Sequence, residues 1–253
     1  MKHSGKARSA ALRLIGLAFA VLLALLAAEP LGRIIGRFVV PHLLDVPGGL
    51  DMAFLRKIIG DLLLDHLTWA LVGLWGLFVV FTFYFFRDPD PMVPAEPNLV
   101  LAPGHGKVDV IDTTTEAEFM GGECQRVAIF LSVIDVHVQC SPVAGRIAFF
   151  KHTPGQYLSA MKTNCAQFNE NVLIGLDAAE PRGEKIGVRL IAGLIARRIV
   201  PWIAQNDTVQ RGERISLIQF GSRVEVYLPS RAKIKVKLGD KVIGGETVIA
   251  AFD

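Results

Sequence analysis

Cysteine is scarce in this chain, and its few cysteines follow no recognised spacing. There are three, Cys124, Cys140 and Cys165, an odd number without a CxxC pair. This pattern fits reduced, buried thiols in the cytoplasm better than a disulfide framework. A metal site built on His137 and Cys140 lacks further ligands at a recognisable spacing, so no metal is expected.

An excess of charge of one sign is also missing. The chain has 27 Lys and Arg against 24 Asp and Glu, a net charge of +3. Such a small excess does not indicate a nucleic-acid partner, and no nucleic-acid motif is visible. It does suit an anionic membrane leaflet.

Two long stretches lack charge almost entirely. Ala10 to Ala28 is interrupted only by Arg13, and Trp69 to Phe86 carries no charged residue. Each approaches the roughly 20 residues needed to cross a bilayer core. We expect the first stretch to be a retained membrane anchor, either spanning the bilayer or lying along it. The alternative is a cleaved signal peptide, although no clean Ala-x-Ala site precedes Glu29.

Basic residues predict how such segments are oriented. Four of them fall within the first thirteen positions: Lys2, Lys6, Arg8 and Arg13. The positive-inside rule therefore predicts a cytoplasmic N-terminus. Because two crossings return the chain to its starting side, everything after Arg87 is expected to face the cytoplasm at the cell (inner) membrane.

Composition divides the chain into three parts. Residues 1–86 are predicted to form a helical membrane-anchoring region, with two amphipathic interfacial helices within Leu31 to Leu67. Residues 87–97 form a proline-rich linker that cannot continue a helix. Residues 98–253 are predicted to be a mainly β domain.

Short alternating or apolar segments separated by glycine turns support the β prediction. Ile195 to Ile203 is left open between a helix and a strand. The predicted strands are Val108–Ile111, Val127–Val133, Arg146–Phe150, Val188–Leu194, Ile215–Phe220, Val224–Leu228 and Ile234–Lys237.

A weak internal repeat refines the predicted fold class. Asp207–Glu213 recurs as Asp240–Glu246, each a polar turn followed by a valine and a glycine. The pattern resembles turns of biotinyl and lipoyl carrier domains and predicts a barrel-sandwich fold. No lysine occupies a hairpin tip, so a carrier function is disfavoured.

The Gly221-Ser222 pair, at the start of an alternating segment, is a candidate site of self-cleavage. Attack of Ser222 on the Gly221 carbonyl would convert the peptide to an ester, and β-elimination would leave a pyruvoyl group at the head of a new chain. His137 is the candidate general base for this step. A bend before an ordinary strand, together with a structural histidine, is the alternative.

Several motifs together resemble those of short-form phosphatidylserine decarboxylases, over Phe85 to Phe252. They occur in the family's order: Phe85-Phe86-Arg87-Asp88-Pro89, Asp135-Val136-His137-Val138, Pro154–Ala160, Ile191–Arg198 and Phe220-Gly221-Ser222-Arg223-Val224.

This resemblance implies an enzyme that decarboxylates phosphatidylserine to phosphatidylethanolamine. It implies cleavage between Gly221 and Ser222 into a β chain 1-221 and an α chain 222-253, with a covalent pyruvoyl cofactor derived from Ser222. His137 matches the family's catalytic histidine. The implied partners are a phospholipid in the membrane and the two cleaved chains, and a homo-oligomer is left open.

The main departure from the family pattern is at position 105. The chain reads Ala102-Pro103-Gly104-His105-Gly106-Lys107-Val108 where the family usually has Ser-Pro-Ala-Asp-Gly-Lys-Val, so His105 replaces the aspartate that orients the catalytic histidine. A neutral His105 can still accept a hydrogen bond from His137, and Asp109 or Asp135 are candidates to supply the missing charge. The alternative function is a non-processing, inactive membrane-bound relative with a scaffolding or regulatory role.

Overall fold

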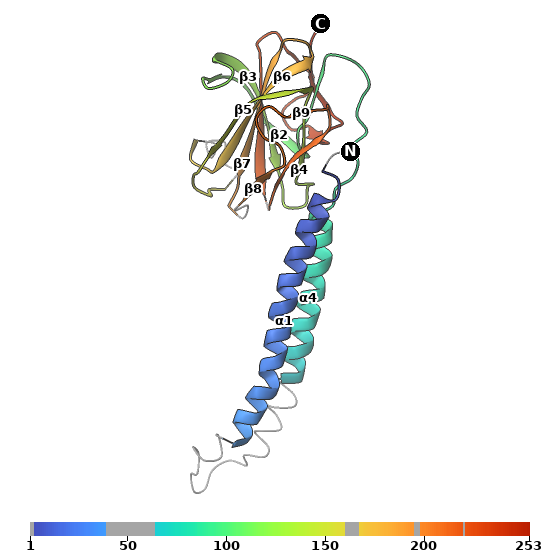
Figure 1. Cartoon of the computed structure of the whole chain (residues 1–253), viewed down its shortest axis with the longest axis vertical. Coiled ribbons are helices and arrows are strands. Elements are labelled where there is room, and N and C mark those ends of the chain that lie inside the picture. Colours follow the sequence, from blue (N-terminus) through green and yellow to red (C-terminus); the bar gives the residue numbers. More distant parts are fainter. Residues whose placement is uncertain (1–2, 39–63, 160–166, 195–197, 220) are drawn as a thin grey trace. The chain divides into compact units, whose positions relative to one another are not determined.

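The structure is a computed structural model that describes residues 3–38, 64–159, 167–194, 198–219 and 221–253 (Figure 1). The chain divides into two compact units. One comprises Ser9–Tyr84, and the other comprises Met1–Arg8 with Phe85–Asp253. The predicted interfacial helices within Leu31 to Leu67 lie largely outside the described residues.

Two helices make up the first unit. They are α1 (Lys6–Phe38) and α4 (Leu64–Phe85). Lys6–Ala27 and His66–Phe85 are long and apolar enough to cross a membrane by length and composition. Most of their large side chains are exposed, among them Leu17 and Leu74. Such apolar surface is suited to lipid rather than to water.

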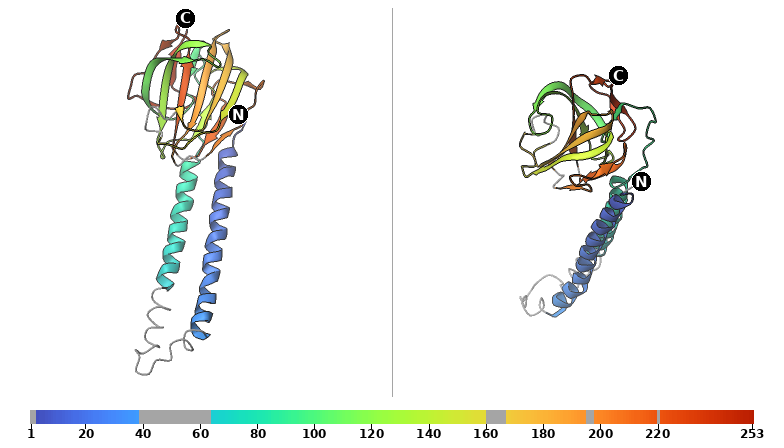
Figure 2. Two further views of the ribbon diagram at one scale, coloured as in Figure 1. Left: turned by 90° about the vertical axis from the view of Figure 1, so that its left-hand side faces the viewer. Right: turned by 45° about the horizontal axis from the view of Figure 1, so that its top comes forward.

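Antiparallel strands build the second unit, in one large and two small sheets (Figure 2). The large sheet has the order β13-β2-β3-β11-β7-β6-β5-β9, and the small sheets are β1-β14-β12 and β4-β10-β8. The strands are β1 (Leu99–Leu101), β2 (Gly106–Glu116), β3 (Gly122–Leu131), β4 (Val138–Cys140), β5 (Ala144–Thr153), β6 (Asn171–Glu180), β7 (Lys185–Ala192), β8 (Ile199–Pro201), β9 (Thr208–Val209), β10 (Arg214–Ile218), β11 (Ser222–Leu228), β12 (Lys233–Ile234), β13 (Lys241–Val242) and β14 (Val248–Ala251).

All three sheets contribute to one apolar core. Val224 and Val226 of β11 enter it, and so do Ile215 of β10 and Ile249 of β14. The predicted fold class, mainly β with two preceding apolar segments, is confirmed. Within Ile195 to Ile203, the described residues include strand β8.

Strand β6 was not among the predicted strands. Its apolar residues run consecutively because both faces of the strand are covered. Val172 and Ile174 enter the main core, whereas Leu173 packs in a second cluster with Cys124 and Tyr227. A strand buried on both faces loses the alternation by which strands are recognised.

The internal repeat has the same hydrogen bonds in both copies. The carboxylate of Asp207 accepts the amide of Ala204 at 2.8 Å, and that of Asp240 accepts the amide of Lys237 at 2.8 Å. Near the end of each copy, Gly212 and Gly245 have φ angles of +75° and +76°. Both glycines therefore take the left-handed conformation that the repeat predicts.

The two copies belong to halves that exchange backbone hydrogen bonds. The amide of Leu101 donates to the carbonyl of Pro142 at 3.0 Å, and the amide of Cys140 donates to the carbonyl of Pro103 at 2.8 Å. Likewise, Gly212 donates to Ser141 and Gly245 donates to Ala102. This reciprocity relates the halves by an approximate two-fold axis, as the barrel-sandwich prediction implies.

Replacing Gly245 by alanine tests the requirement for this turn. Left-handed strain costs about 1–2 kcal/mol, and the added Cβ would lie 2.8 Å from Cβ of Pro91. We expect the free energy of unfolding of Gly245→Ala to fall by about 2–4 kcal/mol, since overpacking adds to the strain.

The matched control is Gly183→Ala, where φ is +81° and no heavy atom lies within 4 Å of the added Cβ. It should lose only the strain component, about 1–2 kcal/mol. Urea denaturation in detergent measures both variants, and equal losses would contradict the close approach at Gly245.

Candidate active site

The Gly221–Ser222 peptide lies where a left-handed residue leads into an interior strand. Gly221 has a φ of +71°, and Ser222 is the first residue of β11. Ser222 pairs with Leu131 of β3 on one side and Ala192 of β7 on the other. The peptide is therefore fixed on its C-terminal side by two neighbouring strands.

The Ser222 hydroxyl is buried and makes no hydrogen bond to any described residue. Leaving a buried polar group unsatisfied costs about 1–3 kcal/mol. Such groups are rare, and a catalytic role is one explanation for them. The serine predicted to form the cofactor thus has a buried hydroxyl that no described residue uses as a hydrogen-bond partner.

His137 is fully buried and is held by backbone groups at both ring nitrogens. Its Nδ1 lies 2.8 Å from the carbonyl oxygen of Asp135, and its Nε2 lies 3.0 Å from the amide nitrogen of Gly221. Only a neutral ring with the proton on Nδ1 satisfies both contacts. The lone pair on Nε2 therefore faces the Gly221 amide.

Burial keeps His137 neutral. The ring of Phe85 packs against it with centroids 4.3 Å apart. The pKa of His137 is lowered to about 4, chiefly by desolvation and also by Arg87 and His105, while Asp135 opposes the shift. At neutral pH the ring is thus available to accept a proton.

His105 lies near His137 but contacts a different backbone group. It occupies the turn between β1 and β2, half-buried, where its Nδ1 accepts the Gly244 amide at 3.3 Å. Burial lowers the pKa of His105, with a contribution from Arg87. Because both nitrogens of His137 face backbone groups, the anticipated His137–His105 hydrogen bond is not formed.

The two carboxylates considered as substitutes have separate partners. The side chain of Asp135 accepts the amide and the hydroxyl of Ser132 at 2.8 and 2.7 Å, and that of Asp109 pairs with Arg223. Only the backbone carbonyl of Asp135 reaches His137. Because every residue has a backbone carbonyl, the sequence could not reveal that the carbonyl of Asp135 orients His137.

A clamp from Arg214 fixes the linker to the β unit. This buried guanidinium donates to the carboxylates of Asp88 and Asp90 at 2.6 and 2.8 Å. Beside it, Nη2 of Arg87 donates to the carbonyl of Ile134 at 2.6 Å. These contacts keep Phe85 against His137. In the sequence, this clamp could have been recognised from Arg214 itself, a single arginine at the start of the apolar strand β10.

The described cysteines are buried and free. Burial raises the pKa of Cys140 to about 12, so this thiol is unreactive at neutral pH. Cys165 lies outside the described residues. In the part of the chain that the structure describes, no three His, Cys, Asp or Glu side chains gather closely enough to hold a metal ion.

Exposed apolar side chains surround this end of the large sheet. Ile134 follows β3 and Leu194 follows β7, each just beyond the residue that pairs with Ser222, and they are 64% and 63% exposed. Leu158 and Phe168, in the connection from β5 to β6, are exposed at the same end. The end that carries the candidate site is therefore apolar at its rim.

Comparison with known proteins agrees with the motifs. A family model described as phosphatidylserine decarboxylase matches residues 78–250. A phosphatidylserine decarboxylase proenzyme of Desulfotalea psychrophila is 44% identical over 179 residues, which cover 71% of this chain and 83% of that protein.

Two further proteins of the same name show similar identity. The protein of Symbiobacterium thermophilum is 41% identical over 181 residues, covering 72% of this chain and 83% of its own length. The protein of Syntrophus aciditrophicus is 40% identical over 173 residues, which cover 68% of this chain and 80% of that protein. The predicted relationship is confirmed, and the chain belongs to the phosphatidylserine decarboxylase family.

Proposed function

We propose that this chain decarboxylates phosphatidylserine to phosphatidylethanolamine, using a pyruvoyl group formed by self-cleavage at Gly221–Ser222. The observation that carries the proposal is the buried hydroxyl of Ser222, which has no hydrogen-bond partner among the described residues and lies beside a glycine whose amide binds neutral His137. These residues fit a cofactor derived from Ser222, since conversion of the hydroxyl would remove no hydrogen bond to a described residue.

Self-cleavage begins with proton transfer from the Ser222 hydroxyl. For this step His137 exchanges the Gly221 amide for the neighbouring hydroxyl, and Nε2 takes the proton as Oγ attacks the Gly221 carbonyl carbon. The C–N bond breaks and its nitrogen is protonated, which leaves an ester between the two residues.

Elimination then completes the cut. Loss of the Ser222 Cα proton breaks the Cβ–O bond, and Gly221 leaves as a carboxylate. Water hydrolyses the resulting dehydroalanine and releases ammonia, which leaves a pyruvoyl group at position 222. In decarboxylation this group supplies a carbonyl that binds the substrate amine and accepts the electron pair left by departing CO₂.

Three observations support a phospholipid substrate at the membrane. The chain has two candidate spans, and the last residue of the second, Phe85, packs on His137. The rim of the site is apolar. Basic residues clustered within the first thirteen positions favour a cytoplasmic N-terminus, so the site would face the cytoplasm at the cell (inner) membrane.

Intact mass spectrometry of the full-length protein tests the proposal. We expect a 32-residue C-terminal fragment (253 − 221) that begins with a pyruvoyl group and is reduced onto an added amine by borohydride. Ser222→Ala should remain a single chain of full mass. A wild-type protein that stays uncut after prolonged incubation would instead favour the non-processing relative.

The role of His105 distinguishes the same alternatives. Because a backbone carbonyl already orients His137, we expect His105→Asp to change the self-cleavage rate by less than about threefold, well below the factor of about 10⁴ typical of losing an orienting aspartate. Pulse-chase electrophoresis measures this rate. An acceleration of a hundredfold or more would show that the missing aspartate limits maturation.

The lowered pKa of His137 makes stability depend on pH. Between the folded value of about 4 and the ordinary 6.5, the unfolded chain binds the proton and the folded chain does not. Stability therefore rises with pH across this window, by about 3 kcal/mol for this group.

Comparing Ser222→Ala with Ser222→Ala/His137→Gln by urea denaturation in detergent between pH 4.5 and 7 isolates this effect. The first protein should gain stability over this range, and the second should gain markedly less. Equal slopes would show that His137 is not desolvated as its surroundings imply.

A further inference from the structure

One face of strand β11 carries polar side chains that are as buried as its apolar ones. Val224 and Val226 enter the main core, whereas Arg223, Glu225 and Tyr227 lie on the opposite face, all three buried. Arg223 is the second residue after the proposed cut and directly follows Ser222. Its guanidinium is one of the largest fully buried groups among the described residues.

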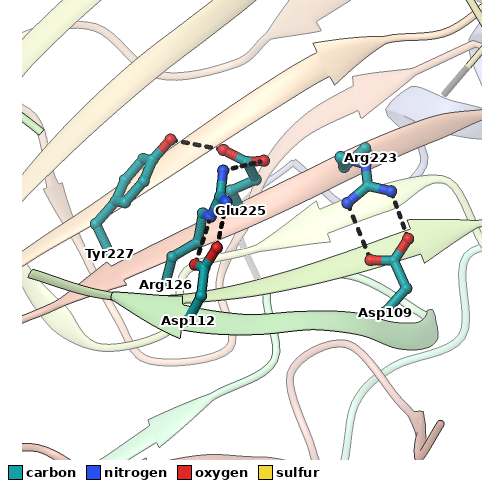
Figure 3. A network of polar contacts seen from close by, with 6 residues as sticks. All are labelled: Asp109, Asp112, Arg126, Arg223, Glu225 and Tyr227. Atoms are coloured by element: carbon teal, nitrogen blue, oxygen red, sulfur yellow. Dashed lines mark hydrogen bonds and ion pairs between the residues drawn. The ribbon is translucent and has the colours of Figure 1, made fainter. Parts of the chain in front are cut away.

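Arg223 forms a two-pronged ion pair across the sheet (Figure 3). Nη1 donates to Oδ1 of Asp109 at 3.0 Å, and Nη2 donates to Oδ2. Asp109 belongs to β2, and β3 lies between β2 and β11. The side chain of Arg223 therefore crosses β3 to contact Asp109 on β2.

A β-bulge gives Asp109 the position that this contact needs. Val108 pairs with Ile129 and Val110 with Ala128, so Asp109 is the extra residue between two consecutive pairs. Bulges redirect a side chain and occur often beside active sites. Without this extra residue, the parts of β2 before and after position 109 would pair with β3 in a single, unshifted register.

Stability alone does not account for this pair. Desolvating two charges costs roughly what their attraction returns, and apolar residues of similar volume are often as stable. In some proteins such a pair fixes one arrangement among several, and here buried Arg223 and partly exposed Asp109 join the start of β11 to β2.

The proposed cut removes one attachment from that start. Before the cut, Ser222 is bonded to Gly221, whose amide is held by His137. Afterwards residue 222 is a chain end without an amide, and Arg223 supplies the first amide and the first long side chain of the new chain. The position of the pyruvoyl carbonyl then depends on how firmly residue 223 is held.

From this geometry we infer that the Arg223–Asp109 pair is a positioning device that keeps the new chain end in place after self-cleavage. The inference rests on the proposed function. It assigns Arg223 and Asp109 no contact with the substrate. They act through the position of residue 222.

The same strand offers a matched control. Asp112 of β2 forms a similar two-pronged pair with Arg126 of β3, at 2.9 and 2.6 Å (Figure 3). It lies three residues further from the site and is more exposed than Asp109. Asp109→Asn and Asp112→Asn thus remove the same charge from similar two-pronged pairs at different distances from the cut, with the difference that Arg126 keeps Glu225 as a second partner at 3.4 Å.

Activity per pyruvoyl group, titrated with borohydride, is the first readout. Both variants should be cut like the wild type. We expect kcat of Asp109→Asn to fall by about 10- to 100-fold with KM within about twofold, because a misplacement of about 1 Å costs about this much. Asp112→Asn should match the wild type.

Hydrogen exchange of the peptide that begins at residue 222 is the second readout. The exchange rate of this peptide should rise in cut Asp109→Asn but not in uncut Ser222→Ala/Asp109→Asn. If the pair had only a structural role, the exchange rate would rise in both proteins. If Asp109→Asn does not fold, the apolar pair Arg223→Met/Asp109→Leu replaces it, since it leaves no buried charge unpaired, and the same loss of kcat is expected.

Three outcomes would overturn the inference. If a cut variant of the pair keeps the wild-type kcat per pyruvoyl group, the pair has no positioning role, and the proposed function is unaffected. If neither variant is cut while the wild type is, the pair is needed before cleavage rather than after it. An uncut wild type would overturn both the proposed function and this inference.

Discussion

Pairing of β11 on both sides is the constraint on which the rest of the structure depends. Its hydrogen bonds to β3 and β7 hold Ser222 from two directions. Its inward valines fill the core that joins the sheets, and its outward residues carry the buried charges. A backbone break at the first residue of such a strand leaves these interactions in place, so the protein can tolerate a cut that would unravel an edge strand.

The environment of His137 shows how a base can be prepared without a carboxylate partner. The Asp135 carbonyl sets the tautomer, the Gly221 amide occupies the lone pair, and Phe85 excludes water from the ring. An orienting carboxylate would stabilise the protonated ring strongly, whereas the Asp135 carbonyl opposes the lowering of the His137 pKa without offsetting the desolvation. The result is a weakly basic histidine, which would suit the proposed self-cleavage because that reaction occurs only once in each molecule.

The sequence could predict features with a local signal. Alternation identified most long strands, the lack of charge identified two apolar helices, and the Gly221-Ser222 pair with His137 identified the candidate site. Features that depend on distant residues were missed. The Arg214 clamp joins positions 126 residues apart, and the Arg223–Asp109 pair requires a bulge whose place is set by pairing with β3. Strand β6 was missed because burial on both faces removes alternation.

The exchange of hydrogen bonds between the two repeat-bearing halves has a consequence for the order of events during synthesis. Strands β1 and β2 pair with β14 and β13, which emerge from the ribosome after β11. The barrel therefore cannot close around Ser222 when that residue is first made. Nascent chains stalled before β13 would lack both the β13–β2 hydrogen bonds and the Gly244 amide that binds His105. If the chain cleaves itself as proposed, this topology places the pairing of the late strands β13 and β14 before the cut.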